Sequence, residues 1–367
     1  MNKIIFLLII YINNFIYANQ IFKLDGLNYN IRNGTDWEPD NCKSLKQIEE
    51  ELIILSTITS NIRIYSLIDC NQGFKILNIL KKINIKIWLG LWVSEDKSIF
   101  INEKNELIKL INLNLIDNNI LGISIGSESL YRNETTINEL FDYINIIKNI
   151  LITYNLNILI TTADIIDIYL DYPILIENLD ILLINQFPFW EKIPLESSMN
   201  NFLLKYNNLT TLNKLNKTII IGETGWSSNG YDNRTSIASL INQAKYFIEF
   251  YNIANLYNWK YFYFSSFDEL WKNKQLNKLD NVESHFGLFY ENGTIKEEIY
   301  NVINLSNYTI ENNKTKKDKI KNNKIENNKI ENNKTENNQN ININQSSKEI
   351  VSIKLIILLF LVILIHI

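Results

Sequence analysis

Histidine and cysteine are scarce in this chain of 367 residues, which contains two of each. The histidines are His285 and His366, so a histidine-dependent catalytic triad would depend on His285 alone, and we set that mechanism aside. No group of cysteines and histidines has the spacing of metal ligands. The sequence therefore predicts no metal site and no cofactor.

The chain also lacks a large excess of charge of either sign. Its formal net charge is -4, which argues against nucleic acid as a partner. Hydrophobic residues make up 46% of the sequence and aromatic residues 12%, which is enough for a large buried core. We expect a monomer that binds no nucleic acid.

The first residues have the pattern of a secretory signal peptide. Residues 1–18 begin with the charged Lys3, continue with an apolar run and end at the small residue Ala18. An N-terminal membrane anchor is the alternative, but Asn13 and Asn14 interrupt the apolar run early. In a secreted chain Cys42 and Cys70 are able to form one disulfide, and two buried free thiols are the alternative. The Asn-X-Ser/Thr sequons, such as Asn133 and Asn292, would then be candidates for glycosylation.

The last residues, 350–367, are predicted to be a signal for a GPI anchor. Their apolar run, from Leu355 to Ile367, is shorter than the roughly 20 residues that span a membrane. Small polar residues lie upstream at Asn344, Ser346 and Ser347, as in such signals. A tail-anchored membrane helix is the alternative. With the GPI anchor, the protein would be held at the cell surface by lipid alone.

Residues 307–349 are rich in Asn, Lys and Glu and repeat the sequence Lys-Ile-Glu-Asn-Asn. A period of five fits neither a helix nor a strand, and the segment has little to bury. We predict a disordered stalk here, which leaves residues 19–306 for the folded domain.

Within that domain, short apolar runs alternate with longer amphipathic segments. Helical periodicity is clearest in residues 44–55, 136–151 and 237–250. Eight such units predict a (β/α)8 TIM barrel, with a doubly wound open sheet as the alternative. The eight predicted strands are residues 24–30, 61–67, 85–93, 120–128, 157–162, 179–189, 217–226 and 260–268.

Two of the predicted strands end in a glutamate, Glu128 and Glu223. A carboxylate at the tip of a buried strand is costly unless it enters a polar site, and in a barrel the strand ends share one face. A pair of carboxylates across a cleft is the machinery of glycoside hydrolysis. A structural ion pair is the alternative for either residue alone.

The motifs around these glutamates resemble those of the glycoside hydrolase family 17 β-1,3-glucanases, in their fungal cell-wall branch. The resemblance runs in family order over roughly residues 24 to 290. It implies that Glu128 is the acid/base and Glu223 the nucleophile of a retaining mechanism on β-1,3-glucan. The matching segments are residues 26–29, 42–44, 62–65, 69–72, 89–92, 125–132, 185–189, 222–226, 266–269 and 283–287.

Two positions depart from the pattern of the wider family. Ser127 precedes the acid/base where much of that family has Asn, although the fungal branch shares the serine. Leu270 replaces the proline of an Asp-Glu-Pro-Trp motif, which puts the placing of Trp271 in doubt but leaves the glutamate pair unaffected.

A sugar cleft needs aromatic faces for the pyranose rings and polar groups for the hydroxyls. We expect Arg63 to pair with a catalytic carboxylate. The predicted substrate-binding residues are Tyr29, Arg63, Tyr65, Asp69, Asn71, Trp92, Ser127, Tyr131, Asn185, Phe187, Trp226 and Asp268.

The sequence thus predicts a secreted, GPI-anchored endo-β-1,3-glucanase of the cell wall. A β-1,3-glucanosyltransferase is the first alternative, because transfer uses the same residues as hydrolysis. A catalytically inactive glucan-binding protein is the second.

Overall fold

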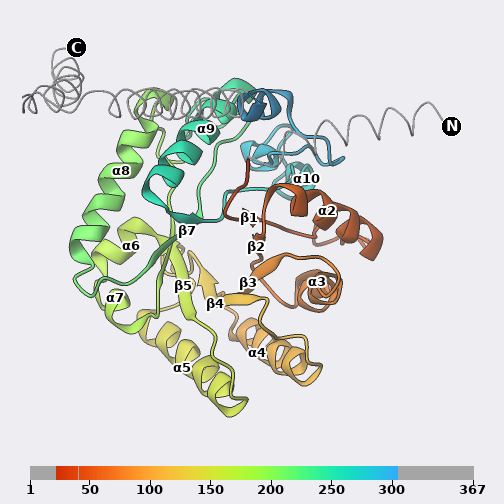
Figure 1. Cartoon of the computed structure of the whole chain (residues 1–367), viewed down its shortest axis with the longest axis vertical. Coiled ribbons are helices and arrows are strands. Elements are labelled where there is room, and N and C mark those ends of the chain that lie inside the picture. The colour runs from red at the N-terminus through yellow and green to blue at the C-terminus, as the bar shows by residue number, and fades with distance from the viewer. Residues whose placement is uncertain (1–21, 40, 305–367) are drawn as a thin grey trace, which may run out of the picture. The chain divides into compact units, whose positions relative to one another are not determined.

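The computed structural model describes residues 22–39 and 41–304 (Figure 1). The predicted signal peptide, the predicted stalk and the C-terminal tail lie outside these residues. Within the described part, no helix is both long and apolar enough to cross a membrane.

Eight parallel strands pair in chain order, from β1 to β8. A parallel bridge between Leu27 and Tyr263 brings the last strand region back to the first. The prediction of a (β/α)8 barrel is therefore confirmed. The strands are β1 (Leu27–Asn28), β2 (Asn61–Arg63), β3 (Lys86–Leu91), β4 (Ile120–Ser127), β5 (Ile160–Ile165), β6 (Leu182–Asn185), β7 (Ile219–Glu223) and β8 (Lys260–Tyr261).

Helices surround the strands, as Figure 1 shows. The three segments with clear helical periodicity form α2, α5 and α9, and each begins at a Ser or Thr whose side chain caps the first turn. The helices are α2 (Leu45–Ile58), α3 (Gln72–Leu80), α4 (Lys97–Asn112), α5 (Ile137–Thr153), α6 (Ile166–Asp171), α7 (Ile174–Asn178), α8 (Leu195–Leu212), α9 (Leu240–Tyr257) and α10 (Trp271–Gln275).

Two predicted strand bounds differ from the structure in ways that matter for the site. Strand β5 continues to Ile165, beyond the predicted end at Thr162, so Asp164 belongs to it. Strand β8 ends at Tyr261, well before the predicted end at Asp268. The chain after β8 instead forms irregular bridges, such as the one between Phe267 and Phe289.

The barrel interior is filled below the site by a small cluster that includes Trp88, Leu183 and Phe262. Gly122 is required there, because a Cβ at this position would lie 2.4 Å from the Trp88 ring. A larger core lies between the strands and the surrounding helices. This packing supports the strands on both faces and leaves their carboxyl ends open for chemistry.

Candidate active site

Glu128 and Glu223 lie at the carboxyl ends of strands of the barrel. Glu223 is the last residue of β7, and Glu128 follows directly after the last residue of β4. Asn185, the last residue of β6, donates from Nδ2 to Oε1 of Glu128 and to Oε1 of Glu223, at 2.9 Å in each case. The two carboxyl oxygens are therefore separated by no more than twice that distance.

Glu223 is surrounded by hydrogen-bond donors. Arg63, fully buried at the end of β2, donates from Nη1 to Glu223 Oε1 at 2.8 Å, as expected for a partner of a catalytic carboxylate. Ser127 Oγ donates to the same oxygen at 3.2 Å and accepts from Arg63 Nη2 at 3.2 Å. These donors favour the charged form of the Glu223 side chain.

Glu128 has a different environment. Its φ angle is 57°, which lies in the left-handed region that non-glycine residues seldom adopt. Burial and the nearby charges of Glu223 and Asp164 raise the pKa of Glu128 to about 7. Donation from Asn185 and the charge of Arg132, whose Nη1 lies 3.7 Å from Oε2, oppose this shift. Thus the Glu128 carboxyl is arranged to hold a proton near neutral pH, whereas the Glu223 carboxyl is surrounded by hydrogen-bond donors.

Two cavities meet at the glutamate pair. The first has a volume of about 940 Å³ and extends over the ends of β1 to β3. The second, of about 820 Å³, extends over the ends of β4 to β6. Because both cavities include Glu128 and Glu223 in their lining, the pair lies inside a cleft that continues on either side.

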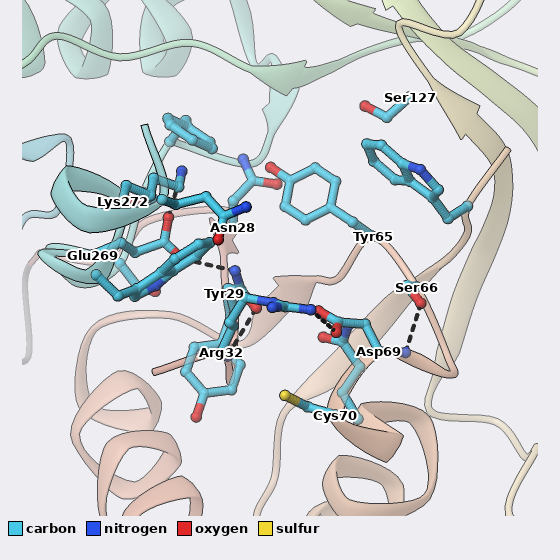
Figure 2. Close-up of a pocket in the computed structure, with 18 of the residues that line it drawn as sticks. Asn28, Tyr29, Arg32, Tyr65, Ser66, Asp69, Cys70, Ser127, Glu269 and Lys272 are labelled. Carbon is cyan, nitrogen blue, oxygen red and sulfur yellow. Dashed lines mark hydrogen bonds and ion pairs between the residues drawn. The ribbon is translucent and has the colours of Figure 1, made fainter. Parts of the chain in front are cut away.

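Most of the predicted binding residues line this cleft. Figure 2 shows the first cavity, with Tyr65 on one side and Lys272 and Glu269 on the other. Arg63 lies behind Glu223 and does not line either cavity. The predicted lining residues of the first cavity are Tyr29, Tyr65, Asp69, Trp92 and Ser127, and those of the second are Trp92, Tyr131, Asn185 and Phe187.

Besides Arg63, three predicted binding residues do not line the cleft. Asn71 is exposed at the start of α3 and lines neither cavity. Trp226 is fully buried and donates from Nε1 to the Ile237 carbonyl at 3.0 Å, so it presents no face to a ligand. Both residues lie beyond the strand end that their motif marks, where the chain has already turned away from the cleft.

Asp268 is a further predicted binding residue that does not line the cleft. It is buried against Lys296, with Oδ1 2.8 Å from Nζ, and Oδ1 also accepts from the Gly287 amide at 3.0 Å. It lines a separate cavity of about 710 Å³ together with His285. Since β8 ends at Tyr261, Asp268 is not a strand-end residue, and its role in this structure is to hold the C-terminal segment at Lys296.

Lys272 and Asp164 lie in or behind the cleft and were not among the binding residues predicted from the sequence. Lys272 pairs with Glu269 at 2.7 Å, at the wall of the first cavity. The spacing of three residues on a helical turn was the available signal. Asp164 lies at the end of β5, behind Glu128, and was missed because its strand was predicted to end too early.

Trp271 lines the first cavity, although Leu270 replaces the proline that precedes this tryptophan in the family motif. Two cations lie near its ring, with Arg32 Cζ 5.7 Å and Lys272 Nζ 5.9 Å from the ring centroid. Its Nε1 is buried without a hydrogen-bond partner among the described residues.

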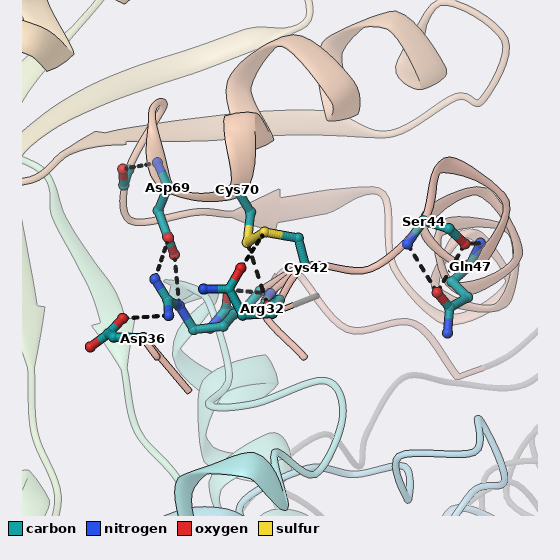
Figure 3. The surroundings of a disulfide bond; sticks show 10 residues. Arg32, Asp36, Cys42, Ser44, Gln47, Asp69 and Cys70 are labelled. Carbon is teal, nitrogen blue, oxygen red and sulfur yellow. Dashed lines mark hydrogen bonds and ion pairs between the residues drawn. A yellow bond between two sulfur atoms is a disulfide. The ribbon is translucent and has the colours of Figure 1, made fainter. Parts of the chain in front are cut away.

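Cys42 and Cys70 are joined by a disulfide, which Figure 3 shows beside the ion pair of Arg32 with Asp69. Arg32 Nη2 lies 2.6 Å from Asp69 Oδ1, and both residues line the first cavity. The disulfide therefore fastens the loop before α2 to the turn that carries Asp69.

The sequence of this chain matches a known protein family. The family model described as the BtgE/BtgC glycoside hydrolase domain matches residues 26–287. A probable glucan endo-1,3-beta-glucosidase of Aspergillus terreus is 27% identical over 265 residues, which cover 67% of this chain and 40% of that protein. A glucan 1,3-beta-glucosidase of Saccharomyces cerevisiae is 26% identical over 298 residues, which cover 77% of this chain and 93% of that one.

Among solved structures, a glycoside hydrolase family 17 beta-1,3-glucanosyltransferase from Rhizomucor miehei is similar, with a TM-score of 0.66 and 28% identity. The match covers 77% of this chain and 97% of that chain. An active-site mutant of the same enzyme was solved in complex with laminaritriose.

Proposed function

The chain belongs to the BtgE/BtgC glycoside hydrolase family, in the fungal branch of glycoside hydrolase family 17, and from this premise we propose that it is a retaining endo-β-1,3-glucanase. The observation that carries the proposal is the pair of glutamates joined by Asn185. The relatives named above as glucan glucosidases support β-1,3-glucan as the substrate.

The distance between the two carboxyls supports retention of configuration. Retaining glycosidases have carboxyl groups about 5–5.5 Å apart, whereas inverting enzymes need about 6.5–9.5 Å for a water molecule. Asn185 Nδ2 is 2.9 Å from one oxygen of each glutamate, which keeps these two oxygens closer together than the inverting range.

In the proposed mechanism Glu223 attacks the anomeric carbon and Glu128 donates its proton to the leaving oxygen. The glycosidic bond breaks, and a glycosyl ester forms on Glu223. Glu128, now charged, then takes a proton from water as that water attacks the ester and releases Glu223. The raised pKa of Glu128, about 7, suits a group that must give up a proton and take one back.

Continuity of the cleft supports cleavage within a chain. Cavities of about 940 Å³ and 820 Å³ lie on the two sides of the glutamate pair. Glucan is therefore able to bind on both sides of the bond that breaks, as an endo-acting enzyme requires.

Two variants test the roles of the glutamates. Glu223→Ala should abolish turnover of every substrate, because no glycosyl ester forms. Glu128→Ala should be much less damaging on an aryl glycoside whose leaving group needs no proton, and added azide should then give a β-glycosyl azide. A β-azide from Glu223→Ala, with an α-azide from Glu128→Ala, would reverse the assignment. A wild-type product of inverted configuration would refute the mechanism.

Transfer to a second glucan is the other candidate function, and the similarity to the Rhizomucor miehei glucanosyltransferase favours it. In transfer, a sugar hydroxyl replaces water in the second step. Incubation with a β-1,3-oligosaccharide, followed by sizing of the products, separates the two. Products longer than the starting sugar mean transfer, shorter products alone mean hydrolysis, and an unchanged sugar would identify an inactive binding protein.

We also propose that the enzyme acts at the cell surface, held by a GPI anchor attached near residues 344–347. The pattern of the terminal sequences supports this location. Phosphatidylinositol-specific phospholipase C should release the protein from cells. Release by detergent alone, with residues 350–367 still present by mass spectrometry, would instead indicate a membrane helix.

A further inference from the structure

Asp164 is a fully buried carboxylate behind the acid/base loop, residues 128–134. Its Oδ2 accepts from the Leu130 amide at 3.2 Å, and its Oδ1 accepts from the Ile165 amide at 2.9 Å. Among the described residues no ion pair is formed by Asp164. We propose that Asp164 is a positioning residue, whose carboxylate holds the loop that presents Glu128. The charge of Asp164 also disfavours the loss of the Glu128 proton. This inference depends on the proposed role of Glu128.

The conformation of Glu128 requires such support. A left-handed φ of 57° costs about 1–3 kcal/mol for a residue of this type and persists only where the surroundings enforce it. The Glu128 amide donates to the Ala163 carbonyl at 2.8 Å, and its own carbonyl accepts from the Arg132 amide at 2.9 Å. Asp164, the neighbour of Ala163 on β5, holds the intervening turn at Leu130. The end of β5 thus holds the loop at two successive residues.

Burial opposes the charged form of Asp164, and several neighbouring groups favour it. The ionisable groups that face it are Glu128 and Arg132 from the loop after β4 and Tyr169 from α6. Burial raises the pKa of Asp164 to about 6, although backbone donors and the charge of Arg132 oppose the shift. A buried charge without an ion-pair partner is costly. Three backbone donors, from Ile165, Leu130 and Tyr131, offset part of that cost.

Arg132 completes the arrangement. Its Nη1 lies 3.7 Å from Glu128 Oε2, and its Nη2 donates to the Ser127 carbonyl at 2.6 Å. Arg132 favours the charged form of Glu128, whereas Asp164 favours the protonated form. The Glu128 proton therefore depends on Asp164 and Arg132 in addition to burial and the charge of Glu223, and both Asp164 and Arg132 also bind backbone groups of the loop.

The test is Asp164→Asn in the full chain, compared on two substrates. An amide offers one oxygen, so either Leu130 or Ile165 would face an N–H group. We expect kcat/KM on a soluble β-1,3-glucan to fall by about 10-fold or more, since general acid catalysis contributes about 10²–10⁴-fold. On an aryl glycoside with a good leaving group, kcat/KM should change little. The alkaline limb of the pH profile on glucan should also move to lower pH.

Asp180→Asn is the matched control. Asp180 accepts from the Ile160 amide at 2.8 Å, the same kind of bond at the opposite end of β5, far from the cleft. Asp180→Asn should leave kcat/KM on both substrates and the pH profile on glucan unchanged. If Asp164→Asn does not fold, Asp164→Ser carries the same comparison, because serine places no second N–H group against the Ile165 amide.

Equal losses on the two substrates, or an alkaline limb that does not move, would overturn the proposal and leave Asp164 with a purely structural role. Glu128→Ala, measured in parallel, keeps the two levels of inference apart. If Glu128→Ala itself shows no dependence on the leaving group, the proposed function fails. If the loss in Glu128→Ala depends on the leaving group and the loss in Asp164→Asn does not, only the proposed role of Asp164 fails.

Discussion

At the scale of single residues, two glutamates acquire different chemistry from their neighbours. Glu223 accepts from Arg63, Ser127 and Asn185, whereas Glu128 accepts from Asn185 alone among these. Burial and the charge of Glu223 then favour the protonated form of Glu128, although Arg132 opposes them. In the proposed mechanism one side chain type therefore serves as acid and as nucleophile in a single cleft.

The pair of Arg63 with Glu223 should be important for stability as well as for catalysis. Arg63→Met would leave the Glu223 carboxylate in a buried site without its cation, which typically costs about 3–5 kcal/mol. Urea unfolding of the variant and the wild type measures this loss. Arg234→Met is the control, because the ion pair of Arg234 with Asp232 has an exposed arginine and should contribute at most about 1 kcal/mol. Similar losses in the two variants would contradict the prediction.

At the scale of elements, α4 holds the ends of two strands together through Glu103. This fully buried glutamate accepts from Ser66 Oγ and from the Leu67 amide, the latter at 2.7 Å, in the loop after β2. The Trp92 amide, after β3, is a further donor. Ser66 Oγ in turn accepts from the Asp69 amide at 2.9 Å, so the bonds continue to the Arg32 pair of the cleft wall.

Burial raises the pKa of Glu103 from 4.5 to about 7, which makes a sign-specific prediction. Between these values the folded protein retains a proton that the unfolded chain has lost, so this group makes the protein less stable as pH rises from about 4.5 to 7. Glu103→Gln does not titrate. The free energy of unfolding, measured with urea at pH 4.5 and 7.5, should therefore rise in the variant relative to the wild type by up to about 3 kcal/mol at the higher pH. A difference in the free energy of unfolding that is the same at both pH values would contradict the raised pKa of Glu103.

The disulfide acts at the same scale, because it joins the loop before α2 to the start of α3. It closes a loop with a sequence separation of 28 residues, and in the chain-entropy model this stabilises the fold by roughly 3–4 kcal/mol. The double variant Cys42→Ser, Cys70→Ser should unfold at correspondingly lower denaturant concentration. Its KM for glucan should also rise, since Cys70 and the neighbouring Asp69 line the first cavity. An unchanged midpoint and KM would show that the loop is held without the bond.

At the scale of the whole molecule, the barrel depends on a segment that follows its last strand. Lys296 is fully buried and pairs with Asp268, and Ile299 and Ile303 pack into the core after it. The catalytic domain must therefore extend past these residues. The composition changes only from about residue 307, where the stalk is predicted to begin.

A chain limited to residues 19–306 should accordingly be soluble and active on β-1,3-glucan. A chain that stops at residue 290 is the control. It lacks Lys296 and leaves Asp268 as a buried unpaired charge, so we expect it to be unfolded or aggregated. Circular dichroism and the release of reducing sugar measure the two properties. A folded but inactive chain 19–306 would mean that the stalk or the tail contributes to the site.

Much of the architecture could be predicted from the sequence, because its signals are local. Apolar runs predicted all eight strands, and the pair of strand-end glutamates lies in the cleft as expected. The end of β5 was placed too early because Thr161 and Thr162 interrupt the apolar pattern, although both are fully buried. That error concealed Asp164, whose polar side chain follows them on the same strand.

The order of the barrel strands and the position of the two glutamates at strand ends could be predicted from the sequence, since both follow from periodicity within short segments. Which side chains contact one another depends on how the strands pack. Arg63 and Glu223 are 160 residues apart in the chain, and Asn185 reaches both glutamates only because β6 lies beside β7 in register. Asn71, Trp226 and Asp268 likewise belong to cleft motifs but turn away from the cleft. Such contacts depend on strand register and on the residue at which each strand ends, and neither is encoded within a single short segment.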